Sequence, residues 1–379
     1  MSLKETLTAY WLHVQHGLLP WLGDAIGPLG EHHRQLASVL GLIRIEALVP
    51  SLAGLPGRPE SERAALARAF VAKAIFNFPA ARLLIEMLAG DKTSRRLRGW
   101  QRAGGVPGEA TFSRAFAAFA ESALPSRLHE ALIKESHTGR LAGHISRDSA
   151  AIEAREKPAA KPEQKAREKR RRGRPRKDGV RPPAPARRIE RQGGMSLTEM
   201  LAGLPRRCDA GAKRNAKGRQ ESWIGCKLHI DTADGEIPVS CVLTPASARD
   251  SQAAIPLATI TNDRVVNLYD LMDSARDAAE IKQYSRNLGH VPVINTNPRA
   301  TPGLKQELAD EAKRLRTAGH RMAEQVRYGE RSAAGRVSSG LKDNHGGRTA
   351  RVRGPDKVMC HLMFGVLSFT ALQLIRPVT

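Results

Sequence analysis

The sequence predicts an α/β protein in which a mixed β-sheet carries helices on both faces. Alternating apolar and polar residues in the second half of the chain indicate strands, and helical periodicity surrounds them. A segment rich in Lys, Arg and Pro interrupts this order. We therefore expect an all-helical domain over residues 1–136 and an α/β domain over residues 137–379. A basic insert at about 155–220 would interrupt the second domain.

The charge balance points to a polyanionic partner. Among 379 residues, 61 Lys and Arg oppose 38 Asp and Glu, which gives a net charge of +23. Such an excess favours association with polyanions and says little about fold. Nucleic acid is the first candidate and a membrane surface the second, and ribosomal proteins share the same bias.

Cysteine usage and hydropathy indicate the compartment. The four cysteines are widely spaced and form no CxxC pair, so they predict neither a disulfide framework nor a zinc site. The first residues lack the profile of a signal peptide. Residues 358–374 are strongly apolar but short, and they predict a buried helix rather than a membrane span. We expect a protein of a reducing cytoplasm that is not associated with a membrane.

The first 136 residues show helical periodicity. Apolar residues recur at helical spacing over 64–88, and Phe112, Phe116 and Phe119 fall on one helix face at i, i+4 and i+7. A helical domain whose only role is packing explains this pattern. Binding of DNA ends is the alternative, which a nearby group of arginines favours: Arg95, Arg96, Arg98 and Arg102.

Residues 143–153 predict a short strand with Asp148 near its middle. A carboxylate inside a strand is either a ligand or a residue of the solvated face. Both interpretations stay open for Asp148 taken alone.

The basic insert begins at residue 155. Residues 155–191 contain 16 Lys and Arg, 5 Asp and Glu and six prolines, so we expect an extended and poorly ordered segment. Within it, residues 169–177 resemble an AT-hook, a motif that enters the narrow minor groove of A·T-rich DNA. The alternative is a basic linker that contacts phosphates without sensing groove shape. The residues of the motif that would contact DNA are Arg172, Gly173, Arg174, Pro175, Arg176 and Lys177.

The elements after the insert follow in a recognisable order. Residues 223–231 and 237–244 alternate with period 2 around Asp234-Gly235, which predicts a hairpin. Asp250 would cap a helix over 253–260 and is interpreted as mainly structural. We also expect strands at 265–272 and 290–294, with Asp273 just past the end of the first. Two more helices are expected, one that begins at Asp277 and one over 304–326.

One further helix is predicted around residues 328–342. At about 100° per residue, Tyr328, Arg331, Gly335 and Lys342 fall within about 60° of one another. The stripe is polar, so it does not fill a core. It predicts a DNA-facing surface with a gap at Gly335.

The order of elements implies a particular sheet. A three-stranded meander followed by parallel strands with covering helices is the order of a ribonuclease-H-like fold, which places the middle of the first strand beside the end of the fourth. Asp148 and Asp273 would then be neighbours. Two adjacent carboxylates repel unless a cation neutralises them, so the pair predicts a divalent metal, Mg²⁺ or Mn²⁺. Two such ions could support phosphodiester chemistry.

The chain resembles the DDE transposases of bacterial insertion sequences. The resemblance rests on the helix from Phe112 to Phe119, on residues 147–158 and 223–277, and on the Tyr-x-x-Arg pattern from Tyr328 to Lys342. It implies that Asp148 and Asp273 are metal-binding carboxylates, and that Tyr328, Arg331 and Lys342 contact the transposon end. The family has a catalytic Glu where this chain has Gly335, and a Tyr where it has Arg276.

The resemblance implies a transposase that binds double-stranded DNA at element ends and at the target, as a homodimer. It also implies a bacterial cytoplasmic protein associated with the nucleoid. Metal-dependent strand cleavage and transfer would be impaired by Gly335. A non-catalytic, repressor-like DNA-binding protein is the alternative, and a metal nuclease is a third interpretation. A glycine-rich helix is itself weakened, by roughly 0.5–1 kcal/mol for each of Gly335 and Gly340 relative to alanine.

Overall fold

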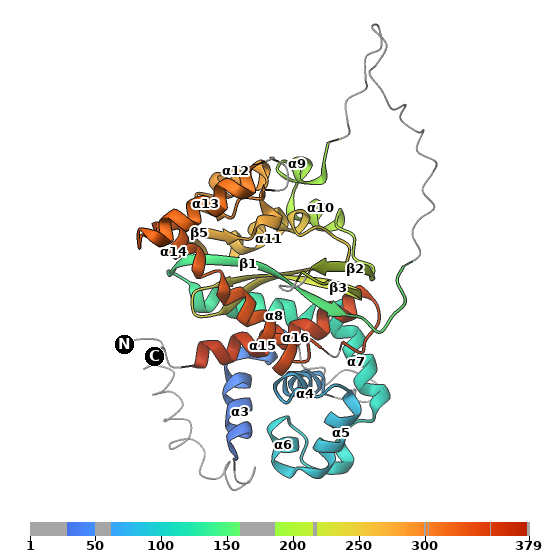
Figure 1. Cartoon of the computed structure of the whole chain (residues 1–379). Helices are drawn as coiled ribbons and strands as arrows, with labels where there is room; N and C mark the ends of the chain where they lie inside the picture. Colours follow the sequence, from blue (N-terminus) through green and yellow to red (C-terminus); the bar gives the residue numbers. More distant parts are fainter. Residues whose placement is uncertain are drawn as a thin grey trace.

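A central mixed sheet with helices on both sides organises the molecule (Figure 1). The computed structural model describes residues 29–49, 62–159, 186–214, 218–298, 301, 303–348 and 350–376. Six strands form the sheet: β1 (Leu141–Glu153), β2 (Asp209–Arg214), β3 (Gln220–Ala233), β4 (Ile237–Pro245), β5 (Val266–Met272) and β6 (Val291–Ile294). The α/β class with a mixed open sheet is confirmed.

The sheet combines an antiparallel and a parallel half. The strand order is β2-β3-β1-β5-β6, with β4 also paired to β3. Strand β3 pairs antiparallel with β1, β2 and β4, whereas β5 pairs parallel with β1 and with β6. Hydrogen bonds on both sides of β1 make it the strand at which the two halves join.

The hairpin between β3 and β4 forms where the sequence predicts it. Gly235 has φ 75° and Glu236 has φ 61°, so the chain turns through the left-handed region where glycine is favoured. The expected strand around Asp148 is also present, and it is longer than predicted.

Helices cover both faces of the sheet (Figure 1). One face carries α11 (Ser251–Arg264), with α9 (Arg188–Gln192), α10 (Leu197–Ala202) and α12 (Ala279–Asn287) packed against it. The other face carries α8 (Leu124–His137), α15 (Ser332–Asn344) and α16 (Pro355–Ile375). Helices α13 (Leu304–Thr317) and α14 (Ala323–Gly329) lie near the β6 edge, and η3 (Ser274–Arg276) follows β5.

The helices that precede β1 pack around α16. Besides α8, they are α3 (Glu31–Ile43), η1 (Ile45–Ala47), α4 (Arg63–Ile75), α5 (Ala81–Gly90), α6 (Lys92–Leu97), η2 (Ala103–Gly105) and α7 (Glu109–Glu121). Phe112, Phe116 and Phe119 of α7 are all buried, as the spacing predicts. The same hydrophobic cluster contains Phe364 of α16, so these helices share a core with the C-terminal helix.

Helix α16 is the segment that hydropathy singled out. It is 21 residues long, and composition and length alone would allow it to cross a membrane. Most of it is buried within the protein, which agrees with the expected buried helix.

Three sequence-based expectations need correction. The run over 64–88 is two helices, because Asn77 takes a left-handed conformation (φ 54°) just before Pro79. The helix over 304–326 is divided at Gly319 (φ 65°) into α13 and α14. The basic insert is partly structured: α9, α10 and the edge strand β2 lie within its expected limits.

Candidate functional site

Asp148 and Asp273 lie side by side at the junction of the two half-sheets. In the parallel pairing of β1 with β5, Arg147 is opposite Met272, so the next residues are Asp148 and Asp273. Arg147 Nη1 is 3.5 Å from Met272 Sδ, which puts that pair on the α11 side of the sheet. Because successive strand residues point to opposite faces, Asp148 is directed toward the α15 side, where Arg331 meets it. The predicted juxtaposition of the two aspartates is present.

Arg331 and Tyr328 cover this pair. Arg331 Nη1 lies 3.9 Å from Asp148 Oδ1, and its guanidinium lies 5.6 Å from the centre of the Tyr328 ring. Burial raises the pKa of the Tyr328 hydroxyl, Arg331 opposes that rise, and the carboxylates of Asp273 and Asp148 add to it. Tyr328, Arg331, Asp148 and Asp273 therefore form one electrostatically coupled group.

Gly335 lies on α15, one turn beyond Arg331. A Cβ atom built at Gly335 meets no atom within 4 Å, so the space beside it is open. Further along α15, Ser338 shares a small cavity with Ala150, two residues after Asp148 on β1. Gly335 therefore lies between Arg331, which faces Asp148 of β1, and Ser338, which faces Ala150 of β1.

Lys342 lies at the far end of the same helix. Eleven residues of helix from Arg331 to Lys342 span about 17 Å, and five residues of strand from Asp148 to Glu153 span about 17 Å. In agreement, Lys342 is near Glu153, and burial together with Lys213 and Arg348 lowers the pKa of its ammonium group. Lys342 is therefore not brought to the carboxylate pair; it lies near the other end of β1, close to Glu153.

The polar stripe is carried by two helices rather than one. Helix α14 ends at Gly329 and α15 begins at Ser332, with hydrogen bonds from Glu330 N to Arg327 O and from Arg331 N to Tyr328 O across the junction. These i to i+3 bonds tighten the chain, so the azimuths calculated for one ideal helix do not hold across the junction. A hydrogen bond from Ser146 Oγ to Glu330 O (3.3 Å) ties the junction to β1.

Asp273 is paired with an arginine that the sequence places three residues later. Arg276 Nη1 lies 2.8 Å from Asp273 Oδ1, and the Arg276 side chain is fully buried. Its Nε and Nη2 atoms have no hydrogen-bond partner among the described residues. Each carboxylate of the pair therefore already has a cation beside it, at 3.9 Å for Asp148 and 2.8 Å for Asp273.

A second polar cluster lies on the α11 side of the same strands. Asp250 is the residue preceding α11, as expected, but its carboxylate makes no capping bond. It accepts hydrogen bonds from Lys227 Nζ (2.9 Å) and Ser149 Oγ (3.2 Å) instead. Despite burial, Arg276, His229 and Lys227 lower the pKa of Asp250. The alternation of side chains along β1 could have shown that Ser149 faces away from Asp148. Its hydrogen bond to Asp250, 101 residues later, could not have been predicted from local sequence.

Of the three carboxylates expected at a metal site, the described residues bring together two, Asp148 and Asp273, and offer no third. Glu324 and Glu330 are exposed, and Asp343 pairs with Arg348 at 2.6 Å. Asp277 pairs with Lys282 at 2.6 Å and accepts a hydrogen bond from Asn297 N; it ends η3 and lies two residues before α12. No group of three His, Cys, Asp or Glu suited to a metal ion occurs in the described part of the chain. Asp148 and Asp273 have the hard oxygen ligands that Mg²⁺ prefers, but Gly335 contributes none.

The AT-hook-like residues cannot be related to this site. Arg172, Gly173, Arg174, Pro175, Arg176 and Lys177 lie outside the described residues.

Comparison of the chain with protein-family models, with curated proteins and with solved structures finds no match.

Proposed function

We propose that this protein is a DDE-type transposase that binds the ends of an insertion sequence as a homodimer, with impaired strand-cleavage chemistry. One observation carries the proposal: Asp148 and Asp273 lie side by side under Tyr328 and Arg331, with Gly335 one helix turn away. Residues separated by more than 180 positions thus converge in the order that the transposase pattern requires.

Sheet topology supports a ribonuclease-H-like fold for the α/β part. Without the edge strand β2, the strands form a three-stranded antiparallel unit, β4-β3-β1, followed by the parallel strands β5 and β6. In that fold the first and fourth strands are neighbours, as β1 and β5 are. The helices that precede β1 are then candidates for binding DNA ends, but only two of the four arginines that suggested this role are accessible. Arg102 is exposed and Arg96 is half-buried, whereas Arg95 and Arg98 are buried and cannot reach DNA.

Gly335 and the two arginines account for the proposed impairment. A divalent metal held by carboxylates supplies an activated oxygen nucleophile and stabilises the leaving oxygen. Here the third carboxylate is missing, and Arg276 and Arg331 compete with a metal for Asp273 and Asp148. Arg331 retains a role in binding, because its half-buried guanidinium, next to a partly neutralised carboxylate, can still contact a DNA phosphate, whereas Arg276 is fully buried.

Restoring the carboxylate tests the proposal. Gly335→Glu should increase Mg²⁺-dependent cleavage of DNA carrying the ends of the gene's own element, because the open space at Gly335 admits the side chain. Gly335→Gln, of equal size and without charge, is the matched control and should not. Asp148→Ala combined with Gly335→Glu should abolish the gain. Strong cleavage by the unmodified protein, lost in Asp148→Ala, would refute the impairment and leave the transposase assignment standing.

A non-catalytic DNA-binding protein is the second candidate. The pairing of both carboxylates with arginines favours it, as does the net charge of +23. In that case Asp148→Ala and Asp273→Ala leave function intact, whereas deletion of residues 169–177 weakens DNA binding and flattens its dependence on salt. A comparison of affinities between about 50 and 200 mM salt measures both effects.

A further inference from the structure

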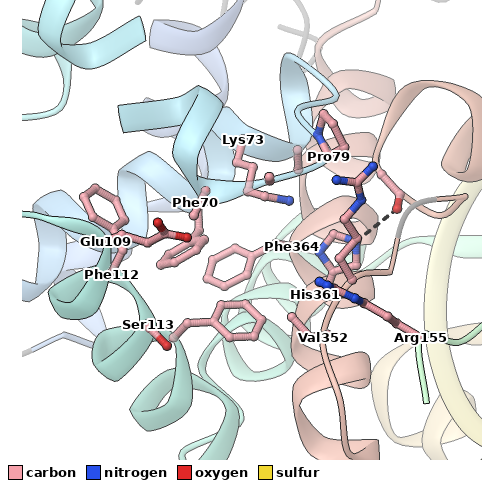
Figure 2. A pocket seen from close by; sticks show the side chains of 16 residues that line it. Phe70, Lys73, Pro79, Glu109, Phe112, Ser113, Arg155, Val352, His361 and Phe364 are labelled. Atoms are coloured by element: carbon pink, nitrogen blue, oxygen red, sulfur yellow. Dashed lines mark hydrogen bonds between the residues drawn. The ribbon is translucent and has the colours of Figure 1, made fainter. Parts of the chain in front are cut away.

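A pocket remote from the aspartate pair lies between the N-terminal helices and α16 (Figure 2). Its volume is about 310 Å³, which is at the lower end of the range for small-ligand sites. Four phenylalanines form one wall: Phe70 of α4, Phe112 and Phe116 of α7, and Phe364 of α16. Their rings contact one another, with centroids 5.1 Å apart for Phe70 and Phe116 and 5.6 Å apart for Phe70 and Phe364.

Cationic side chains from three separate segments line the same pocket. Lys73 comes from α4, Arg155 follows β1, and Arg351 precedes α16. Figure 2 shows the Lys73 side chain reaching into the pocket, between the phenylalanines on one side and the side chains of His361 and Arg155 on the other. Glu109, on the side of Phe112, is the one acidic residue in the lining.

Lys73 is the unusual member of this group. Its side chain is only 9% exposed, and it forms no ion pair with any residue that the structure describes. Burial, and then the like charge of Arg351, lower the pKa of its ammonium group to about 8. A buried cation facing a second cation costs folding free energy unless an anion compensates it.

The pocket is held open by contacts unrelated to the aspartate pair. Asn77, just after α4, donates to Asp343 O (2.7 Å) and accepts from Gly346 N (2.9 Å), which fixes the loop leading to Arg351. His361 Nε2 donates a hydrogen bond to Gly346 O at 3.0 Å. Burial lowers the pKa of His361 to about 4, so this imidazole is neutral near pH 7 and adds no charge.

We propose that this pocket binds a nucleotide, with the phosphate between Lys73, Arg155 and Arg351 and the base against the phenylalanine wall. A bare phosphate would leave the apolar part of the pocket lining uncovered, and an uncharged aromatic compound would leave the cations without a counter-ion. A nucleotide satisfies both, and Glu109 is placed to accept a hydrogen bond from an amino group of the base. The nucleotide is either free in solution or the phosphorylated end of a DNA strand. The inference does not depend on the proposed transposase activity.

Titration calorimetry on the full chain at constant ionic strength tests the site. We expect adenosine monophosphate to bind more tightly than inorganic phosphate or adenosine. Lys73→Met keeps the length of the side chain and should weaken binding by about tenfold or more, through loss of charge-assisted hydrogen bonds. Arg351 is exposed at the rim of the pocket, so Arg351→Gln should weaken nucleotide binding without disturbing the packing of the hydrophobic core. Arg114→Gln, on the exposed face of α7 and outside the pocket, is the matched control.

Two single-stranded oligonucleotides, with and without a 5′-phosphate, show whether the bound nucleotide is free in solution or the end of a DNA strand. If the mononucleotide binds, the site accepts a free nucleotide. If only a 5′-phosphorylated single strand binds, and its unphosphorylated counterpart does not, the site holds a strand end. Affinity should also fall as the pH rises above about 8, where Lys73 loses its proton. Equal binding of phosphate and nucleotide, unchanged affinity in both pocket variants, or no binding of any probe would overturn the proposal.

Discussion

At the scale of single residues, the charges buried on the α11 side of the sheet are structural. Arg147 Nε and Nη2 donate to the two carboxylate oxygens of Asp231 at 2.7 and 2.6 Å, and Thr261 Oγ1 donates to Asp231 Oδ2 at 2.6 Å. Both charged side chains are at most 2% exposed. Arg147 and Asp148 are adjacent in sequence, yet Arg147 is part of the core and Asp148 is part of the candidate site.

Removing one partner of this pair should be costly. Arg147→Met leaves the Asp231 carboxylate buried without a counter-ion, and we expect a loss of about 3–5 kcal/mol in the free energy of unfolding. The double variant Arg147→Met/Asp231→Leu removes both charges and should recover most of that loss. Urea denaturation measures both values. A loss below about 1 kcal/mol for Arg147→Met would show that the pair has little structural role.

Residue patterns predicted the position of the aspartates but not their partners. The sequence predicted strands at 143–153 and 265–272, which correspond to β1 and β5, and the inferred strand order then placed Asp148 beside Asp273. The ion pair of Asp273 with Arg276 depends on a 3-10 turn that directs a buried guanidinium backward, for which residue type gives no signal. The bond between Lys227 and Asp250 depends on how the chain leaves β4 for α11, and long-range placement of this kind is not encoded in local periodicity.

At the scale of elements, the two glycines of α15 have different reasons for being glycine. A Cβ at Gly335 meets open space, whereas a Cβ at Gly340 would lie 2.7 Å from Cε2 of Phe369, a buried residue of α16. Gly340 therefore permits the close approach of α15 and α16. Gly335 has no such packing role, and the expectation that both simply weaken the helix holds only for Gly335.

Alanine substitution separates the two glycines. Gly335→Ala should raise the free energy of unfolding by about 0.5–1 kcal/mol, because alanine favours the helix and meets no atom. Gly340→Ala should lower it by about 1–3 kcal/mol, because the Phe369 ring must move. Each variant is the control for the other in thermal or urea denaturation. Equal effects of the two substitutions would contradict the packing argument.

Element boundaries were the weakest part of the sequence-based prediction. Apolar periodicity continues across Asn77, Gly319 and the turn at Glu330, where the backbone nevertheless leaves the helix. Within the basic insert, the short polar helices α9 and α10 are stabilised by packing on α11, and α10 also has a capping box at Ser196. Tertiary contact, rather than intrinsic helix propensity, stabilises such short helices.

At the scale of the whole molecule, α16 joins the two parts that composition suggested were separate domains. One side of α16 belongs to the core of the N-terminal helices, through Cys360, Phe364, Leu367 and Ala371. Its other side belongs to the core beneath the sheet, through Val358, Leu362, Met363, Val366 and Phe369. Hydrogen bonds cross the same boundary: His129 on α8 contacts both Pro238 O at 3.0 Å and Thr370 Oγ1 at 3.2 Å.

A helix buried on both sides should make unfolding cooperative across that boundary. We expect a single transition, with hydrogen exchange in α4 and in β3 governed by a common opening free energy. Phe364→Ala should lower the protection of both by about 3–5 kcal/mol, because it opens a cavity where α4, α7 and α16 meet. Ser122→Ala, on the exposed C-terminal cap of α7, is a control that should leave β3 unaffected. A change confined to α4 would show that the N-terminal helices unfold on their own, as two independent domains would.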